Sequence, residues 1–279
     1  MINSGIYGKV YKVPGNLALK IIDHNDDGIC SSFLKEMDFL NHTKHPNVIP
    51  YYNFLIDDQE SKFMMPRADS TLYQYIKSKK PFLHTYQHPY ALSCVAKDIM
   101  YEIALGTNYL HKNFIIHQDL KPLNILMFRN TPVICDFGLS SWCLNGEMEF
   151  IRPVQTLDYR SPEIILRNRY TNKVDIWSLG LIFYFIATRK NLLCLDHKSN
   201  EIDLVIQIKT KIGQFSDEQE KQLKKYDIPD FSNEYFKYFP KNFENLLRGM
   251  LERDPEKRFN CEQVLNHIFF LEKKQEMIT

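Results

Sequence analysis

The segment HQDLKPLNIL, His117–Leu126, and the triplet DFG at residues 136–138 decide the fold. Together they supply the polar groups that phosphoryl transfer needs, namely Asp119, Lys121, Asn124 and Asp136. A carboxylate accepts the proton of an attacking hydroxyl, a lysine neutralises phosphate charge, and carboxylate and amide oxygens suit a hard divalent cation. The alternative is a pair of unrelated turns, but both motifs in this order arise by chance well under about one time in a thousand.

The composition indicates a soluble protein of the cytoplasm or nucleus that binds neither nucleic acid nor membrane. Lys and Arg number 35 against 34 Asp and Glu, so the basic excess of a nucleic-acid-binding surface is absent. The six cysteines have no Cys-x-x-Cys spacing, which favours reduced thiols over a zinc site or a disulfide framework. The first residues lack a signal-peptide core, and the most apolar stretch, Leu179–Ala187, is shorter than the ~20 residues that cross a bilayer.

The first part of the chain reads mostly as strands. The segments with strand patterns are Tyr7–Val13, Leu17–Ile22, Val48–Ile56 and Phe63–Met65. A Pro-Gly-Asn turn between the first two predicts a hairpin. Ser31 or Ser32 is a cap candidate for a helix that follows.

Helical patterns dominate the rest of the chain, which predicts an α+β fold of two lobes. The predicted helices include Val95–His111, Ile176–Ala187 and a last helix from Asn260 to Leu271. We expect one domain over residues 1–273, with a small β-rich lobe at 1–66 and a large α-helical lobe at 67–273. Residues 274–279 then form a short tail, and a cleft between the lobes falls near residues 60–70.

Two segments of the small lobe carry residues suited to a nucleotide. The glycines Gly5 and Gly8 let the backbone approach phosphate closely, although such a segment alone is more often only a turn. Lys20 lies in an apolar strand, where a lysine usually extends its ammonium group to solvent at an edge. Glu36 on the next helix offers it a partner, which a buried cation requires.

With these motifs the chain resembles eukaryotic protein kinases of the serine/threonine class over essentially its whole length. The resemblance implies a bilobal kinase fold that transfers the γ-phosphate of ATP, with Mg²⁺, to Ser/Thr hydroxyls of protein substrates. It makes Asp119 the catalytic base, Lys121 its partner at the transferred phosphate and Thr156 their brace, with Asn124 and Asp136 as Mg²⁺ ligands. It assigns an ATP pocket to Ile2, Gly5, Gly8, Val10, Ala18, Lys20, Glu36, Met65 and Leu126.

Later motifs extend the resemblance into the large lobe. Ser161-Pro162-Glu163 is similar to the A-P-E motif, and Arg258 matches the arginine that pairs in the family with that glutamate. Asp175 matches the helix aspartate that braces the catalytic loop in the family.

Within the superfamily the chain is most similar to the cyclin-dependent kinase group. Gly28–Glu36, GICSSFLKE, resembles the G-V-P-S-T-A-I-R-E helix that cyclins grip, with three identities. Thr156–Glu163, TLDYRSPE, resembles T-L-W-Y-R-A-P-E, with Asp158 in place of tryptophan, and Lys190–Phe239 stands where the group has a helical insert. The resemblance implies a cyclin-like activator on the Ser31–Leu40 helix and a preference for proline after the target residue.

Two positions depart from the family pattern in ways that bear on regulation. Gln118 replaces the arginine that holds a phosphorylated activation loop, because a guanidinium binds phosphate bidentately and an amide cannot. Ile151 stands where the phosphorylated threonine would be, so we expect no activation by loop phosphorylation. Tyr7 aligns with an inhibitory tyrosine, where phosphate would repel ATP; simple packing or exposure is the alternative.

Two other functions compete with the kinase reading. A pseudokinase scaffold is suggested only by Asn3 in place of the first glycine of the loop, while the other expected cleft residues are intact. A small-molecule kinase is disfavoured by the peptide-docking segment Thr156–Glu163. The chain begins where the family's first strand would be ending, so an edge of the small lobe is either covered by a partner or missing from an incomplete start.

Overall fold

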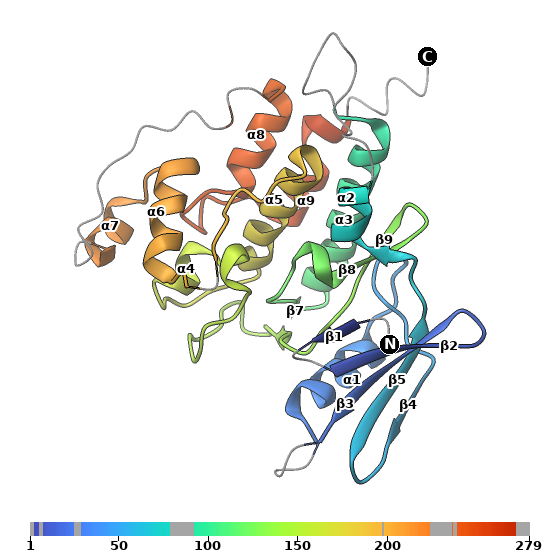
Figure 1. Ribbon diagram of the computed structural model, residues 1–279. Helices are drawn as coiled ribbons and strands as arrows, with labels where there is room; N and C mark the ends of the chain where they lie inside the picture. Colours follow the sequence, from blue (N-terminus) through green and yellow to red (C-terminus); the bar gives the residue numbers. More distant parts are fainter. Residues whose placement is uncertain are drawn as a thin grey trace.

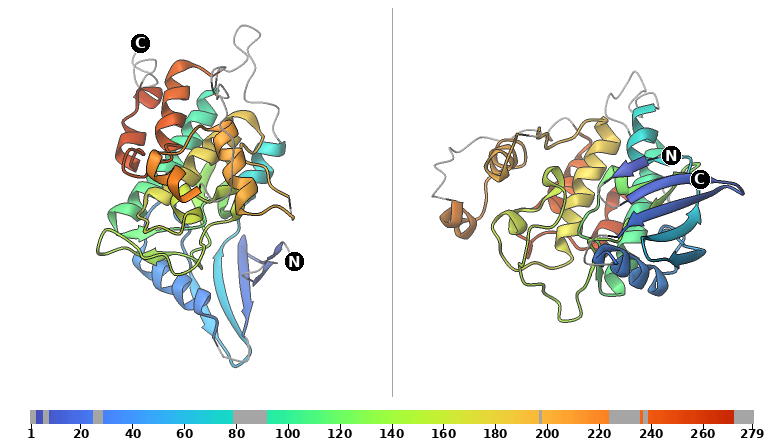
Figure 2. Two further views of the ribbon diagram at one scale, coloured as in Figure 1. Left: turned by 90° about the vertical axis from the view of Figure 1, so that its left-hand side faces the viewer. Right: turned by 60° about the horizontal axis from the view of Figure 1, so that its bottom comes forward.

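Two lobes make up the fold, a small one built on a sheet and a large one built mainly of helices (Figure 1). The computed structural model describes residues 3–5, 8–24, 29–78, 92–196, 198–223, 236 and 239–271. The views in Figure 2 show the same separation of the blue, strand-rich lobe from the helical lobe. The predicted α+β, bilobal architecture is therefore confirmed.

The small lobe is a five-stranded antiparallel sheet in the order β1-β2-β3-β5-β4. Its strands are β1 (Asn3–Gly5), β2 (Gly8–Val13), β3 (Leu17–Asp23), β4 (Asn53–Ile56) and β5 (Glu60–Pro66). The predicted hairpin is confirmed, since β2 and β3 pair across the turn. The predicted strand at Val48–Ile56 is wrong in its first half, where Pro50 has no N–H for a ladder and Val48 pairs instead with Ile134 of the large lobe.

One helix, α1 (Ser31–His42), packs on this sheet. The ring of Phe33 lies 4.5 Å from that of Phe63 on β5, and the Phe33 side chain is fully buried. The expected serine cap is wrong: Cys30 is the N-cap, and no side chain among the described residues caps the helix. The Cys30 carbonyl accepts the N–H groups of Phe33 and Leu34, and packing rather than a cap stabilises the helix.

The large lobe is organised around α5, which is buried along almost its whole length. Its helices are α2 (Leu72–Ser78), α3 (Cys94–Lys112), α4 (Pro162–Ile165), α5 (Lys173–Thr188), α6 (Glu201–Lys211), α7 (Asp217–Leu223), α8 (Lys241–Met250) and α9 (Cys261–Leu265). The last helix starts with the predicted Asn260–Gln263 capping box but ends at Leu265. The prediction of one helix to Leu271 is wrong, because His267 Nδ1 accepts the N–H of Phe269 and starts a separate helical turn.

Short strands of the large lobe position the loops that carry the polar motifs. These strands are β6 (Ser70–Thr71), β7 (Ile115–Ile116), β8 (Ile125–Phe128), β9 (Thr131–Ile134) and β10 (Ser141–Trp142). The HQDLKPLN segment lies between β7 and β8, and DFG follows β9 after Cys135. Since β8 pairs with β9 and β7 with β10, both motifs are brought to one place.

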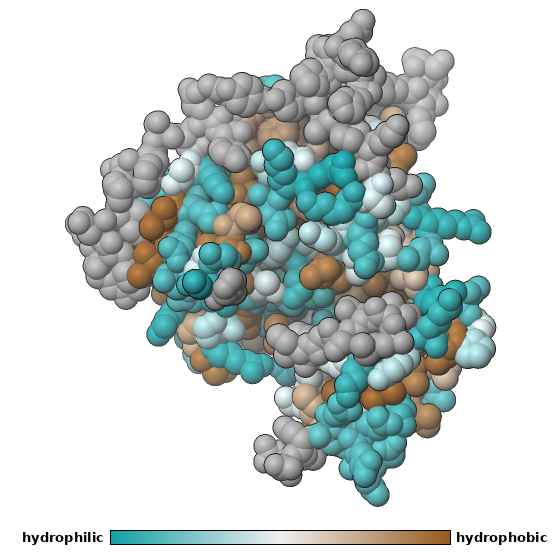
Figure 3. All heavy atoms as spheres, viewed as in Figure 1, coloured by the Kyte–Doolittle hydropathy of each residue, from teal (hydrophilic) through white to brown (hydrophobic). Residues whose placement is uncertain are grey.

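The surface seen from the side of Figure 1 is mainly hydrophilic, with separate hydrophobic areas (Figure 3). Over the described part of the chain, no helix is both long enough and apolar enough to cross a membrane.

Candidate active site

Asp175 on α5 holds the backbone of the loop that carries Asp119. Its two carboxylate oxygens accept the N–H of His117 at 2.8 Å and the N–H of Gln118 at 2.9 Å. Gln118 has a left-handed backbone with φ 64°, a conformation that costs about 1–3 kcal/mol outside glycine. The hydrogen bond to the buried Asp175 carboxylate helps to keep this conformation, so α5 holds the loop that leads into Asp119.

Asp119 accepts hydrogen bonds from three side chains that the sequence singled out. Its Oδ1 accepts the Thr156 hydroxyl at 2.8 Å and the Thr156 N–H at 3.0 Å. Its Oδ2 accepts the Lys121 ammonium group at 2.8 Å and the Asn124 amide at 3.0 Å. Lys121 also donates to the Thr156 hydroxyl at 2.7 Å, so the four residues form one network around a buried carboxylate.

Lys20 joins the small lobe to the DFG segment. Its Nζ lies 2.6 Å from a carboxylate oxygen of Glu36 on α1 and 3.0 Å from one of Asp136. Burial alone would lower the pKa of Lys20, but the two carboxylates raise it above its ordinary value, and the group stays an ammonium. The structure thus brings together three predicted residues from distant parts of the chain.

Asn124 and Asp136 present oxygen atoms of the kind that Mg²⁺ prefers. The Asn124 amide nitrogen donates to the backbone and side-chain oxygens of Asp119, and this network assigns its orientation. Among the described residues, no group of three or more His, Cys, Asp or Glu side chains is placed to hold a metal ion. Mg²⁺ is commonly bound by one or two carboxylates together with substrate phosphates and water, so these residues fit that ion.

The glycine-rich segment is described in part. Gly5 ends β1, and Gly8 starts β2 with φ 120°. A Cβ on Gly8 would lie 2.4 Å from the carbonyl oxygen of Ile21, so only glycine fits there. Ile2 and Tyr7, like the tail at 274–279, lie outside the described residues.

The apolar residues assigned to the nucleotide pocket lie on neighbouring strands. Val10 pairs with Lys20 across β2 and β3, and Ala18 pairs with Met65 across β3 and β5. Leu126 lies on β8 in the other lobe and is half-buried. Val10 therefore lies directly beside Lys20, and Leu126 belongs to the strand that pairs with β9, just before DFG.

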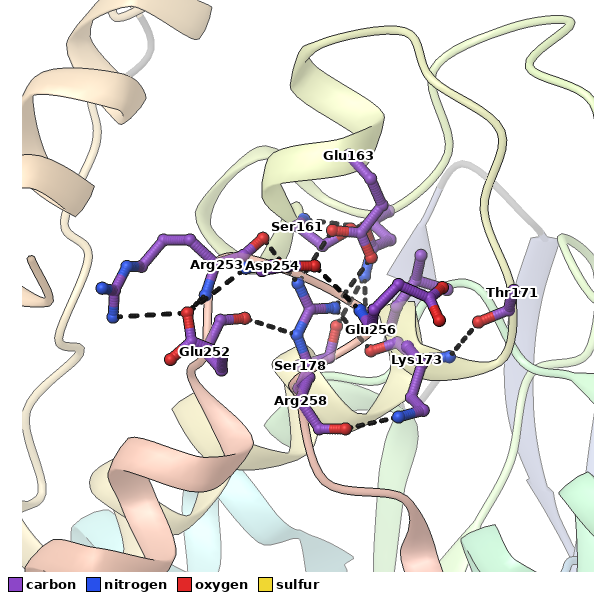
Figure 4. Close-up of polar contacts among 12 residues, drawn as sticks. Ser161, Glu163, Thr171, Lys173, Ser178, Glu252, Arg253, Asp254, Glu256 and Arg258 are labelled. Atoms are coloured by element: carbon purple, nitrogen blue, oxygen red, sulfur yellow. Dashed lines mark hydrogen bonds and ion pairs between the residues drawn. The ribbon is translucent and has the colours of Figure 1, made fainter. Parts of the chain in front are cut away.

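A buried ion pair joins the A-P-E-like motif to the segment between α8 and α9 (Figure 4). The guanidinium group of Arg258 donates to both carboxylate oxygens of Glu163, at 2.7 and 2.8 Å. Arg258 also donates to the carbonyls of Glu252, Lys173 and Arg253, which satisfies its remaining donors. The pair expected from the resemblance is therefore present.

Gln118 makes a neutral contact with Tyr170, which follows the A-P-E-like motif. Its amide donates to the hydroxyl of Tyr170 at 3.1 Å. Tyr170 belongs to a buried apolar cluster whose other members are Ile116, Cys143, Val154, Ile164 and Val174, with Met148 and Phe150 packed against it. The side chain of Ile151 is 87% exposed. The residues before it, Met148 and Phe150, are therefore the ones that attach this part of the chain to the cluster.

Gln155 is a buried residue that sequence reasoning missed. Its backbone has φ 67°, and its side chain is 4% exposed. The amide oxygen accepts the N–H and the hydroxyl of Ser161, and the amide nitrogen donates to the carbonyl of Val174 and the hydroxyl of Ser178. No spacing pattern marks this position, because its partners lie on α5 and in the following motif.

The family comparison agrees with this geometry. A protein-family model described as Protein kinase domain matches residues 1–270. The match includes both lobes and every residue of the Asp119, Lys20 and Glu163 networks. The chain therefore belongs to the eukaryotic-type protein kinase superfamily, whose members transfer phosphate to proteins.

Proposed function

We propose that the protein is a serine/threonine kinase that transfers the γ-phosphate of ATP to hydroxyls of protein substrates. The observation that carries this proposal is the network of Asp119, Lys121 and Thr156. A carboxylate held by these donors is oriented to accept the proton of an alcohol, and the lysine beside it offsets charge on the phosphate. We take residues 1–273 as the kinase domain.

The other site residues bind and orient the nucleotide. Lys20, kept charged by Glu36, is suited to neutralise phosphate oxygens, and Asn124 and Asp136 are suited to hold Mg²⁺, which offsets phosphate charge when bound. The glycine backbone would face the phosphates, and the apolar strand residues would pack on the base. The pseudokinase alternative has little support, because Lys20 contacts both Glu36 and Asp136, and Lys121 contacts Asp119.

The assay that tests this proposal measures transfer of labelled phosphate from ATP to a generic protein, with wild type and Asp119→Asn compared. We expect the variant to lose at least ~100-fold in kcat, since a positioned base contributes about that much. Lys257→Gln, at an exposed pair on the large lobe, is the matched control and should keep full activity. Equal rates of phosphate transfer for wild type and Asp119→Asn would exclude the proposal that the protein is an enzyme.

A cyclin-dependent-kinase-like preference for proline after the target residue is supported by Gln155. Gln155 has a left-handed backbone conformation, and its carbonyl accepts a hydrogen bond from the guanidinium group of Arg160 at 3.2 Å. A carbonyl engaged in this way is less available to a substrate N–H, and proline has none to offer. A peptide library in which every residue after the target is accepted equally would end this proposal.

Independence from activation-loop phosphorylation is supported by the neutral Gln118–Tyr170 contact and the exposed Ile151. In the family an arginine binds a phosphate group on the activation loop, and this chain has the neutral amide of Gln118 at that position. We expect phosphatase treatment to leave kcat unchanged, and a large loss of kcat would contradict the proposal.

A cyclin-like partner on the Ser31–Leu40 helix is supported only by exposed apolar side chains. Ile29 and Leu34 are 39% and 43% exposed, while Gly28 lies outside the described residues. We also propose a cytoplasmic or nuclear location, because all six cysteines are unpaired.

A further inference from the structure

Trp142 joins the beginning of the activation segment to α1. Its indole Nε1 donates a hydrogen bond to the Asp38 carboxylate at 2.8 Å. Its ring lies 5.0 Å from that of Phe39 and 5.6 Å from that of His42, with the His42 ring edge-on. A single side chain of the large lobe thus contacts three residues on the last turns of α1.

Trp142 is itself held in the large lobe, close to the catalytic loop. It pairs with Ile115 across β10 and β7, and β7 leads directly into His117. The Phe39 ring also lies 6.4 Å from that of Phe137 in DFG, and Phe137 lies 5.1 Å from the ring of His117. An aromatic series therefore runs from α1 to the loop that carries Asp119.

The α1 residues that contact Trp142 lie next to Glu36 on the helix, so a movement of one shifts the other. Glu36 and Phe39 are three residues apart, so they lie on neighbouring parts of the same helix face. At the other end of α1, Phe33 packs on Phe63 of the sheet. If the contact with Trp142 is lost, the helix keeps its packing on the sheet and the Phe39–Phe137 contact but loses its hydrogen bond to the large lobe through Asp38. A rotation that moves Phe39 then also moves Glu36 away from Lys20.

We propose that Trp142 is a positioning residue that holds α1 where Glu36 contacts Lys20, so the chain itself performs the task that an activator on α1 would perform. This inference rests on the proposed kinase function. A cyclin-like partner on the outer side of α1 remains compatible with it, but the position of Glu36 does not depend on that partner.

The direct test is amide hydrogen exchange of the full chain, followed over residues 31–42 in wild type, Trp142→Ala and Trp142→Phe. We expect Trp142→Ala to raise exchange in α1 about tenfold or more without changing exchange in α5. Trp142→Phe, which keeps a ring but loses the N–H donor, should lie between the two. Tyr52→Ala removes an aromatic ring that is 61% exposed on the small lobe and serves as the matched control.

Kinetics then separate a positioning role from a merely structural one. Trp142→Ala and Asp38→Ala, which removes the acceptor of the indole N–H, should lower kcat. Trp142→Ala should cost little more in a Glu36→Gln background, because the effect passes through Glu36. Full additivity, or unchanged exchange in α1 of Trp142→Ala, would overturn the inference. An inactive wild type would count against the kinase proposal alone, since exchange in α1 decides the inference without turnover.

Discussion

Two glutamines next to the site take left-handed backbone conformations, Gln118 with φ 64° and Gln155 with φ 67°. Such conformations cost about 1–3 kcal/mol each and persist only where the surroundings hold them. The Asp175 carboxylate holds Gln118, and α5 and Ser161 hold the side chain of Gln155. Their neighbours along the chain are Asp119 and Thr156, so the constraint orients the catalytic network before any substrate binds.

The buried His111 gives a pH-dependent prediction at the residue scale. Burial lowers the pKa of His111, but Cys261 and Asp175 more than offset this and raise it from 6.5 to about 10. The folded chain therefore binds more protons than the unfolded chain in this range, and the free energy of unfolding should fall as pH rises from 6.5 to about 10. Urea denaturation across this range, with wild type compared to His111→Gln, measures the effect.

The difference between the two curves isolates His111 from other groups that titrate in the same range. Cys261→Ala should move the window to lower pH, because the thiol beside Nδ1 at 3.6 Å contributes to the raised pKa. If the free energy of unfolding falls equally with pH in wild type and His111→Gln, the imidazole of His111 is not the cause of the pH dependence.

At the scale of elements, α8 needs a glycine where the Arg258 segment crosses it. A Cβ on Gly249 would lie 2.1 Å from the ring of Phe259, and the Gly249 carbonyl accepts the Phe259 N–H at 3.0 Å. The same crossing brings Arg258 to Glu163, so close contact of two segments positions the buried ion pair. Packing, not helix propensity, selects the residue at this point.

Gly249→Ala is therefore expected to destabilise the fold although alanine is the better helix former by about 1 kcal/mol. The ring of Phe259 must move, and such overpacking typically costs about 1–3 kcal/mol. Gly180→Ala on α5 is the comparison, since its Cβ would meet side-chain atoms of Leu251 and Met250 no closer than 2.9 Å, against 2.1 Å at Gly249. Chemical denaturation measures both, and a larger loss for Gly180→Ala would contradict the packing argument.

For the whole molecule, the two lobes meet through charged and aromatic side chains at the site. Lys20, which is paired with Glu36 in the small lobe, contacts Asp136, and Asp38 and Phe39 contact Trp142. The pair Lys20–Asp136 spans 116 positions of sequence, so its formation reports that the lobes are assembled. A ligand that binds this junction stabilises both lobes together.

Thermal unfolding with ATP and Mg²⁺ tests this expectation. A ligand at one hundred times its Kd stabilises the bound fold by ~2.7 kcal/mol, so the unfolding temperature should rise. Asp136→Asn should lose the increment that depends on Mg²⁺, and chelation of the metal should remove it from wild type. The exposed Asp58→Asn is the control, and a full increment in Asp136→Asn would refute the assignment of Asp136 as a metal ligand.

Sequence alone was sufficient to predict the fold class, the hairpin, most long helices and the network around Asp119. Asp119, Lys121 and Asn124 lie within one loop, so their spacing along the chain already reflects the chemistry they share. Apolar periodicity identified α3 and α5 for a similar reason, since helix faces repeat locally. The serine cap of α1 was wrong because packing on the sheet stabilises that helix without a side-chain cap, and the length of the last helix was wrong because His267 starts a separate turn.

Only the tertiary structure decided what the remaining polar and aromatic side chains do. Gln155 has no distinguishing neighbours in sequence, and it becomes a buried anchor because α5 passes beside it. Trp142 and Asp38 are 104 positions apart, and no local pattern connects them. Contacts of this kind depend on which surfaces the two lobes bring together, so they follow from the packing of the whole chain and not from any segment of it.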